Sequence, residues 1–257
     1  MPSSAPLLAG RGLCKSYGAV EAIRGIDFEI MPGEIVGFAG DNGAGKSTLM
    51  KILAGSVRPS DGELALAGEL IADFAPAHAR ARGIEMVYQD LALCENLDAR
   101  ENIFLGREPR RRLLGLRMIA TEHMTAATTA LLGRLEVEIP SVFEPVATLS
   151  GGQRQAVAIC RALAFKPTIV LMDEPTAALS VNAVEPLLRL IRRLPTEGAA
   201  VMLVSHRLSD LISVTDRIYV LRNGQVVGNL QTATTSEEEL LRLMAGLSTN
   251  GSRSGQR

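Results

Sequence analysis

Short apolar runs alternate with amphipathic helical patterns along most of the chain. Strands are predicted where the apolar runs are rich in β-branched and aliphatic residues, at positions 34–39, 84–88, 168–172 and 199–204. Helical periodicity fills positions 46–53, 154–164, 184–194 and 237–244. Apolar strands that alternate with helices are typical of a parallel sheet with covering helices. The pattern therefore predicts an α/β core.

Two other stretches have different patterns. Near the N-terminus, positions 7–17 and 25–30 predict antiparallel strands, with 63–67 as a candidate third, and Asn223-Gly224 between apolar runs predicts a hairpin. Strand signals fade over 91–147, which is mainly helical and predicts an inserted lobe. We therefore expect a single domain, 1–247, with an α/β core and β lobe (about 1–89 and 162–247) and a helical lobe (about 90–161). The polar residues 248–257 are expected to be disordered.

Composition narrows the class of protein. The 257 residues are 47% hydrophobic and 21% charged, as expected for a globule with a sizeable core. A net charge of -1 argues against a general nucleic-acid binder, which carries a basic excess. Cys14, Cys94 and Cys160 lack metal-site spacing and are expected to be buried packing residues in a reducing compartment. No apolar run approaches the roughly 20 residues that span a bilayer, so we expect a cytoplasmic protein.

A glycine-rich loop joins the predicted strand 34–39 to the predicted helix 46–53. It fits the pattern G-x-x-x-x-G-K-[ST], in which backbone N–H groups and a helix N-terminus surround phosphate oxygens. Lys46 is expected to reach the β- and γ-phosphates of ATP, Ser47 to bind Mg²⁺, and Thr48 to hydrogen-bond the α-phosphate. The candidate nucleotide-binding residues here are Gly40, Asp41, Asn42, Gly43, Ala44, Gly45, Lys46, Ser47 and Thr48.

Two adjacent carboxylates end the predicted strand 168–172. Ligands of open α/β sheets lie at the carboxyl ends of strands, so Asp173 is a candidate ligand of Mg²⁺, directly or through water. Glu174 is then placed to act as general base on the attacking water. Taken alone, such a pair is more often a helix cap or a turn, and it is the upstream phosphate loop that favours the catalytic interpretation.

A second glycine loop, Leu149-Ser150-Gly151-Gly152-Gln153, leads into the predicted helix 154–164. A hydroxyl cap, two glycines and a helix N-terminus again make an anion site, although a plain glycine turn capped by Ser150 has the same pattern. One nucleotide needs only one phosphate loop. The second loop therefore suggests contact with a nucleotide that another copy of the chain holds.

The glycine loop at 40–47 is a Walker A motif, and the apolar strand that ends in Asp173-Glu174 is a Walker B motif. With LSGGQ between them, the chain resembles the nucleotide-binding domains of ABC transporters over about residues 7–247. The resemblance implies a P-loop NTPase (RecA-like) core with an antiparallel β lobe and an inserted helical lobe. It implies that two copies sandwich ATP and Mg²⁺, and that Ser150, Gly151, Gly152 and Gln153 contact the opposite copy's nucleotide. It also implies membrane permease subunits as partners at the inner face of the membrane.

The resemblance gives roles to three residues that are weak signals alone. Tyr17 looks like the aromatic residue that stacks on adenine. Gln89 looks like the glutamine that senses the γ-phosphate and Mg²⁺ and borders the membrane-subunit contact. His206 looks like the histidine that contacts the γ-phosphate, although a lone histidine is usually structural.

Two features are less regular. The family usually has Asp in an S-A-L-D pattern after Walker B, whereas this chain has Ser180, which puts one contact across the dimer in doubt. A basic cluster either faces solvent, the commoner case, or contacts anionic lipid or a membrane subunit. Its members are Arg107, Arg110, Arg111, Arg112 and Arg117.

A finer resemblance is to ATP-binding subunits of bacterial monosaccharide importers of the ribose, xylose and fructose group. It rests on GDNG at 40–43, QDLALCENL at 89–97, ENIFLGRE at 101–108 and EPTAAL at 174–179. It implies ATP-driven import, with a periplasmic solute-binding protein as an indirect partner. The alternatives are import of another small solute, or an ABC-type ATPase outside transport, although 89–149 leaves no room for the long coiled coil of repair ATPases.

Overall fold

A six-stranded sheet forms the centre of the protein, with strand order β12-β11-β3-β10-β9-β6. The computed structural model describes residues 5–113, 116–177 and 179–247, so the expected disordered tail 248–257 lies outside the described residues. Strands β6, β9, β10, β3 and β11 run parallel, and β12 pairs antiparallel with β11. The strands are β3 (Ile35–Gly40), β6 (Ile84–Val87), β9 (Ile169–Asp173), β10 (Ala200–Val204), β11 (Arg217–Arg222) and β12 (Gln225–Gln231).

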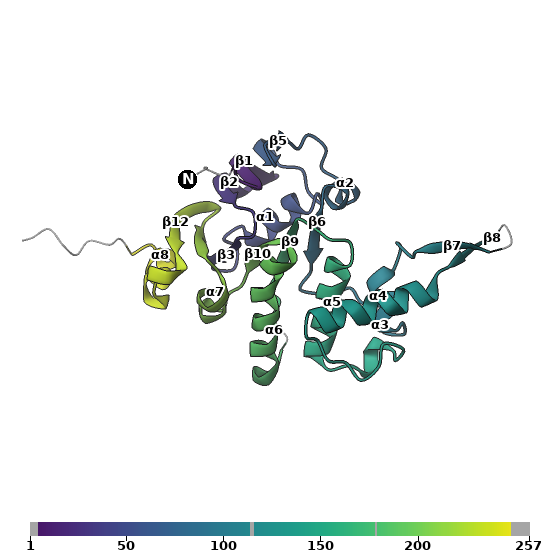
Figure 1. Ribbon diagram of the computed structural model, residues 1–257. Coiled ribbons are helices and arrows are strands. Elements are labelled where there is room, and N and C mark those ends of the chain that lie inside the picture. The colour runs from purple at the N-terminus through teal and green to yellow at the C-terminus, as the bar shows by residue number, and fades with distance from the viewer. Residues whose placement is uncertain (1–4, 114–115, 178, 248–257) are drawn as a thin grey trace, which may run out of the picture.

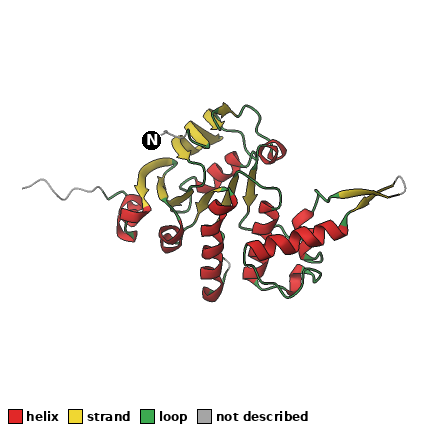
Figure 2. Ribbon diagram, viewed as in Figure 1, coloured by secondary structure: helices red, strands yellow, loops and turns green. Residues whose placement is uncertain are grey.

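Both faces of strands β3, β9 and β10 are buried, which explains why these strands are almost continuously apolar. Along β3, Ile35 and Ala39 pack into one core, while Val36 and Phe38 pack into the other. The helices of the first core are α5 (Gly151–Leu163), α6 (Val181–Arg193), α7 (Leu208–Val214) and α8 (Glu237–Ala245). Helix α1 (Lys46–Leu53) belongs to the second core. Figures 1 and 2 show the helices around the central strands.

An antiparallel β lobe covers the second core. Its strand order is β2-β1-β4-β5, and Leu8 and Phe28 pack in the same cluster as Leu49 of α1. Strand β2 begins at Val20, earlier than the sequence predicts. The Glu29 backbone N–H donates to the Tyr219 hydroxyl at 3.0 Å, which fastens the lobe to β11. The lobe comprises β1 (Leu8–Tyr17), β2 (Val20–Ile30), β4 (Asp61–Leu66) and β5 (Glu69–Leu70), followed by α2 (Pro76–Ala81).

The inserted lobe is helical with one exception. Helices α3 (Ala99–Phe104) and α4 (Thr121–Arg134) pack against α5, through which the lobe joins the first core. Between them lies a two-stranded hairpin, β7 (Arg110–Leu113) and β8 (Leu116–Ile119), which projects from the body of the molecule (Figure 1). The sequence does not predict this hairpin, because arginines occupy positions at which an apolar alternation would mark a strand.

Four other details differ from the sequence-based expectations or complete them. Helix α7 was not predicted, and its seven residues are too short to show a clear period. The prediction of buried cysteines is wrong for Cys94, which is exposed, while burial raises the pKa of the Cys160 thiol to about 12. The described residues also form short 3₁₀ turns at Val146–Thr148, Leu194–Glu197 and Thr232–Thr234. No helix within the described ranges is long and apolar enough to cross a membrane.

Candidate functional site

Four loops meet at one edge of the central sheet. Strands β3, β10, β9 and β6 are neighbours and run parallel, so their carboxyl ends share that edge. The glycine loop follows β3, His206 follows β10, Glu174 follows β9 and Gln89 follows β6. Topology therefore gathers residues that are far apart in the sequence.

A cavity of about 720 Å³ opens between these loops. Residues from all four loops line it together with residues of the β lobe and α8. The lining residues are Val20, Glu21, Ala22, Gly40, Asp41, Asn42, Gly43, Gly45, Lys46, Ser47, Thr48, Gln89, Glu174, His206 and Met244. Val20, Glu21, Ala22 and Met244 were not among the predicted site residues, and no sequence motif marks them.

The phosphate loop depends on glycine for its backbone. Gly43 and Gly45 have φ values of 84° and 106°, in the left-handed region that favours glycine. A Cβ at Gly45 would lie 2.7 Å from the Ala22 carbonyl oxygen, so a side chain there would also clash with β2. The close approach of β2 thus fixes the loop and adds the β lobe to the cavity wall.

Lys46 is a buried cation at the start of α1. It is 7% exposed, and its Nζ donates to the carbonyl oxygens of Gly40 at 2.6 Å and Asp41 at 3.0 Å. Burial lowers the pKa of Lys46, whereas Glu174, Asp173 and Asp41 oppose that shift. An ammonium group held in a low-dielectric loop attracts phosphate oxygens more strongly than one in water.

Asp173, the last residue of β9, is half-buried, and its Oδ1 atom is fully buried. Among the described residues its Oδ1 has no hydrogen-bond partner. Burial, followed by the charge of Glu174, raises the pKa of Asp173, and Lys46 opposes the shift. Such a buried unpartnered oxygen needs a positive or proton-donating ligand, which suits Mg²⁺ or its bound water. Ser47, exposed in the first turn of α1, offers the hydroxyl for the same ion.

Glu174 and His206 form a direct pair, with 2.6 Å between Oε2 and Nδ1. The Glu174 backbone N–H donates to the Val204 carbonyl oxygen at 2.9 Å, which links the ends of β9 and β10. Glu174 also has φ 50°, a left-handed conformation that costs a non-glycine residue about 1 kcal/mol or more. The fold therefore holds this carboxylate in a strained position beside the histidine and the phosphate loop.

Of the two residues Gln89 and Tyr17, Gln89 lines the cavity and Tyr17 does not. Gln89 is exposed and lines the cavity. Tyr17 ends β1, is 48% exposed and pairs across the sheet with Val20, which lines the cavity. Its ring already has a cation near it, because Lys15 Nζ lies 5.2 Å from the ring centroid.

Arg161 of α5 is a site neighbour that the sequence analysis missed. Its guanidinium donates to the carbonyl oxygens of Leu91 at 2.6 Å and Ala92 at 2.7 Å. Burial lowers its pKa, and a nearby acidic residue, Glu85, opposes the shift. Arg161 thus holds the segment that follows Gln89 against the helix that follows the second glycine loop, and no short motif indicates this contact.

The second glycine loop lies elsewhere in the single chain. Ser150 and Gln153 form a capping box, with N–H to oxygen distances of 3.3 and 3.0 Å, and α5 begins at Gly151. A Cβ on Gly152 would lie 3.1 Å from the Ala183 Cβ, so α5 and α6 approach closely here. None of Ser150, Gly151, Gly152 or Gln153 lines the cavity at the phosphate loop. One chain alone therefore leaves this anion site without the nucleotide.

Ser180 is the N-cap residue of α6 and makes no side-chain capping hydrogen bond. Ser180→Ala should therefore leave ATP hydrolysis within about threefold of the wild-type rate, because less than one neutral hydrogen bond is at stake. Steady-state phosphate release from the two purified proteins measures this. Ser180→Asp, which restores the carboxylate that the family usually has, serves as a comparison. Loss of activity in a folded Ser180→Ala protein would show that the hydroxyl is required.

The sequence is similar to a known protein family and to several of its members. A sequence profile of the ABC transporter family matches residues 23–177. The xylose/arabinose import ATP-binding protein XylG of Sulfolobus acidocaldarius is 42% identical, covering 93% of each chain. The fructose import ATP-binding protein FrcA of Rhizobium meliloti is 43% identical, covering 86% of each chain. The ribose import ATP-binding protein RbsA 3 of Rubrobacter xylanophilus is 41% identical over 94% of this chain, which spans only 48% of that relative.

Solved structures give the same result for the fold. The ATP-binding cassette MJ1267 of an ABC transporter superposes with a TM-score of 0.80 at 24% identity, covering 94% of this chain and 96% of that one. The bacterial ABC transporter cassette MJ0796, solved as a dimer, gives a TM-score of 0.73 at 29% identity, covering 88% and 98%. These likenesses confirm the predicted fold class and the resemblance drawn from the sequence motifs.

Proposed function

Since the chain belongs to the ABC transporter family, we propose that it is the ATP-binding and ATP-hydrolysing subunit that energises a membrane importer for a monosaccharide. The observation that carries this proposal is the convergence of the phosphate loop, Asp173, Glu174 and His206 at one sheet edge. The relatives supply the direction of transport and the class of solute, because import of xylose/arabinose, fructose and ribose is in their names.

ATP binds with its phosphates in the loop from Gly40 to Thr48. The backbone N–H groups and Lys46 hold the phosphate oxygens, and Tyr17 stacks on the adenine ring. Ser47, Asp173 and Gln89 would hold Mg²⁺, which would neutralise charge on the phosphates. The unpartnered Oδ1 of Asp173 is the observation that supports this ligand set.

Glu174 accepts the proton of the attacking water. Its carboxylate is 13% exposed and is held by His206, whose ring is 58% exposed toward the cavity side of the pair. A carboxylate fixed at this distance orients the water and receives its proton as the water oxygen bonds to the γ-phosphorus, while the bond from that phosphorus to the β,γ-bridging oxygen breaks and ADP leaves. His206 keeps Glu174 in position and contacts the γ-phosphate with its other ring nitrogen.

Two copies of the chain act together. The second glycine loop lies outside the cavity of its own chain, which supports its use against the nucleotide of the opposite copy. Ser150, Gly151, Gly152 and Gln153 present a helix N-terminus to that nucleotide's phosphates. The dimeric structures of MJ0796 show that a cassette of this fold assembles in pairs.

Membrane permease subunits are the partners that turn closure of the pair into transport. We place the chain at the inner, cytoplasmic face of the membrane, with a periplasmic solute-binding protein as an indirect partner of the same importer. The surface beside Gln89 and Arg161 is the proposed contact with the permease. Movement of this segment is coupled to the nucleotide through Gln89 and to α5 through Arg161.

Deletion of the gene should abolish ATP-driven uptake of one monosaccharide. Uptake of labelled ribose, xylose, arabinose and fructose by the deletion strain and its parent measures this. The wild-type gene should restore uptake, and a Lys46→Ala copy expressed at the same level should not. Normal uptake of every monosaccharide, together with a defect for an amino acid or an exported drug, would contradict monosaccharide import while leaving the ATPase assignment intact.

A further inference from the structure

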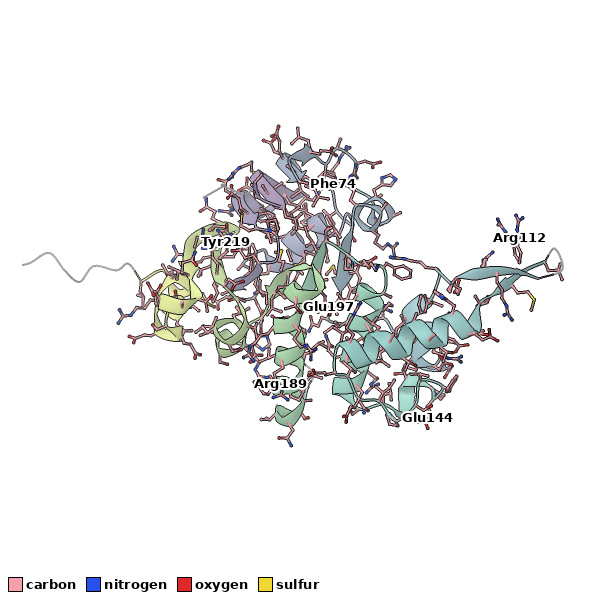
Figure 3. The ribbon with its side chains drawn as sticks, in the orientation of Figure 1. Phe74, Arg112, Glu144, Arg189, Glu197 and Tyr219 are labelled. Atoms are coloured by element: carbon pink, nitrogen blue, oxygen red, sulfur yellow. The ribbon has the colours of Figure 1, made fainter. Side chains whose placement is uncertain are left out.

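The β7–β8 hairpin of the helical lobe concentrates positive charge far from the nucleotide site. Its two described strands carry Arg110, Arg111, Arg112 and Arg117 and no acidic residue, whereas the whole chain has a net charge of -1. The two strands pair with each other, and each contacts the other elements far less than it contacts its partner strand. Figure 3 shows Arg112 on this projection, distant from Tyr219 at the central sheet.

Three of these arginines form no ion pair within the described residues. Arg111 lies 3.4 Å from Glu122, but within the described residues no carboxylate forms an ion pair with Arg110, Arg112 or Arg117. Arg107, the fifth member of the basic cluster in the sequence, is a different case because it binds Glu85 at 2.6 Å and stacks on Phe165. The unpaired charge is therefore a property of the hairpin and not of the whole cluster.

The strand register places the unpaired arginines on one face. Arg110 lies opposite Ile119 and Arg112 lies opposite Arg117, so side-chain alternation puts all four on the same side. Like charges directly across a strand pair destabilise it. Ile119 shares this face with the arginines and is 50% exposed, whereas Leu116 and Met118 lie on the opposite face. Basic and apolar side chains together on a projecting, self-contained hairpin match the interface of a membrane that contains anionic lipid.

We propose that the β7–β8 hairpin binds the anionic headgroup surface of the membrane, through Arg110, Arg112 and Arg117, with Ile119 of the same face entering the interface. This proposal rests on the importer role proposed above, because a subunit of a membrane importer lies close to the membrane surface. The lipid contact then fixes how the helical lobe is oriented relative to the bilayer. It requires only weak intrinsic affinity, because the permease holds the hairpin at high effective concentration near the lipid.

Vesicle binding by the purified full chain, without permease, tests the proposal directly. At about 0.05 M salt the chain should float with phosphatidylglycerol-containing vesicles and not with phosphatidylcholine vesicles, and binding should disappear at about 0.5 M salt. Replacing Arg110, Arg112 and Arg117 by Gln should weaken partitioning on the order of 100-fold, since each basic residue contributes about fivefold.

A matched control separates local binding from total charge. Gln at Arg82, Arg189 and Arg242, exposed on other elements, gives the same net charge and should leave partitioning within about twofold of wild type. Lys at Arg110, Arg112 and Arg117 should retain binding, because a headgroup layer accepts either cation. Equal partitioning of the two Gln variants, or no binding of wild type to anionic vesicles, would overturn the proposal.

A fluorescent reporter locates the contact. The chain has no tryptophan, so Ile119→Trp places a single probe on the arginine face of the hairpin. Its emission should shift to the blue with anionic vesicles, while Phe143→Trp, exposed elsewhere on the lobe, should not shift. No shift from Ile119→Trp would exclude insertion. If the Gln variant at Arg110, Arg112 and Arg117 binds vesicles as wild type does but loses the permease, the hairpin is a protein contact and the lipid proposal is wrong. ATP hydrolysis by these variants checks the proposed function separately.

Discussion

Lys46→Ala should lower the rate of ATP hydrolysis by about 10²-fold or more. The Lys46 ammonium is buried in the phosphate loop, where it donates hydrogen bonds to the Gly40 and Asp41 carbonyl oxygens. The developing charge on the transferring phosphoryl group would lose this preorganised cation, and removal of one such group costs about 10²–10³ in rate. Phosphate release at saturating Mg-ATP measures the loss.

Lys51→Ala provides the matched control for Lys46→Ala. Lys51 lies in the last turn of the same helix and is exposed, so its removal changes the net charge equally without touching the loop. Its rate should stay within about threefold of wild type, as for other surface changes. Equal turnover by Lys46→Ala and wild type would contradict the assignment of this loop to ATP.

The core of the fold was predictable because the signals are local. Strands β3, β9 and β10 are buried on both faces, so each is a nearly continuous apolar run in the sequence. The β7–β8 hairpin was not predictable, because Arg110, Arg112 and Arg117 stand where apolar residues would mark strands. The side chains of 110–112 and 116–119 are exposed, so the hairpin leaves no burial pattern in its sequence.

The site followed from the sequence only where residues form short motifs. The loop from Gly40 to Thr48 and the pair Asp173-Glu174 carry their chemistry in adjacent positions. Gln89 and His206 needed the resemblance, since strand order alone brings them to the cavity. Contacts such as that of Arg161 with the Leu91 carbonyl oxygen join positions about 70 apart and depend on tertiary packing, which a single sequence does not encode in any local pattern.

Glu174→Gln should abolish most ATP hydrolysis while leaving ATP bound. Glutamine has the size of glutamate and can still accept a hydrogen bond from His206 Nδ1, but it cannot take a proton from water at neutral pH. Loss of a general base costs about 10²–10⁴-fold in rate. Lys46, Ser47 and Asp173 are untouched, so nucleotide affinity should remain.

A dimer held by two unhydrolysed nucleotides is the second expected effect of Glu174→Gln. ATP bound between the phosphate loop of one copy and Ser150–Gln153 of the other favours the closed pair by mass action. Sedimentation with and without Mg-ATP should show a monomer that becomes a dimer only with ATP. Ser150→Arg in the Glu174→Gln background should keep the chain monomeric, because it blocks the opposite anion site. Glu185→Gln, exposed on α6, should hydrolyse ATP normally and form no stable dimer. A Glu174→Gln protein that binds ATP yet stays monomeric, both alone and with its permease, would contradict the nucleotide sandwich, because nothing would then bring the second glycine loop to a phosphate.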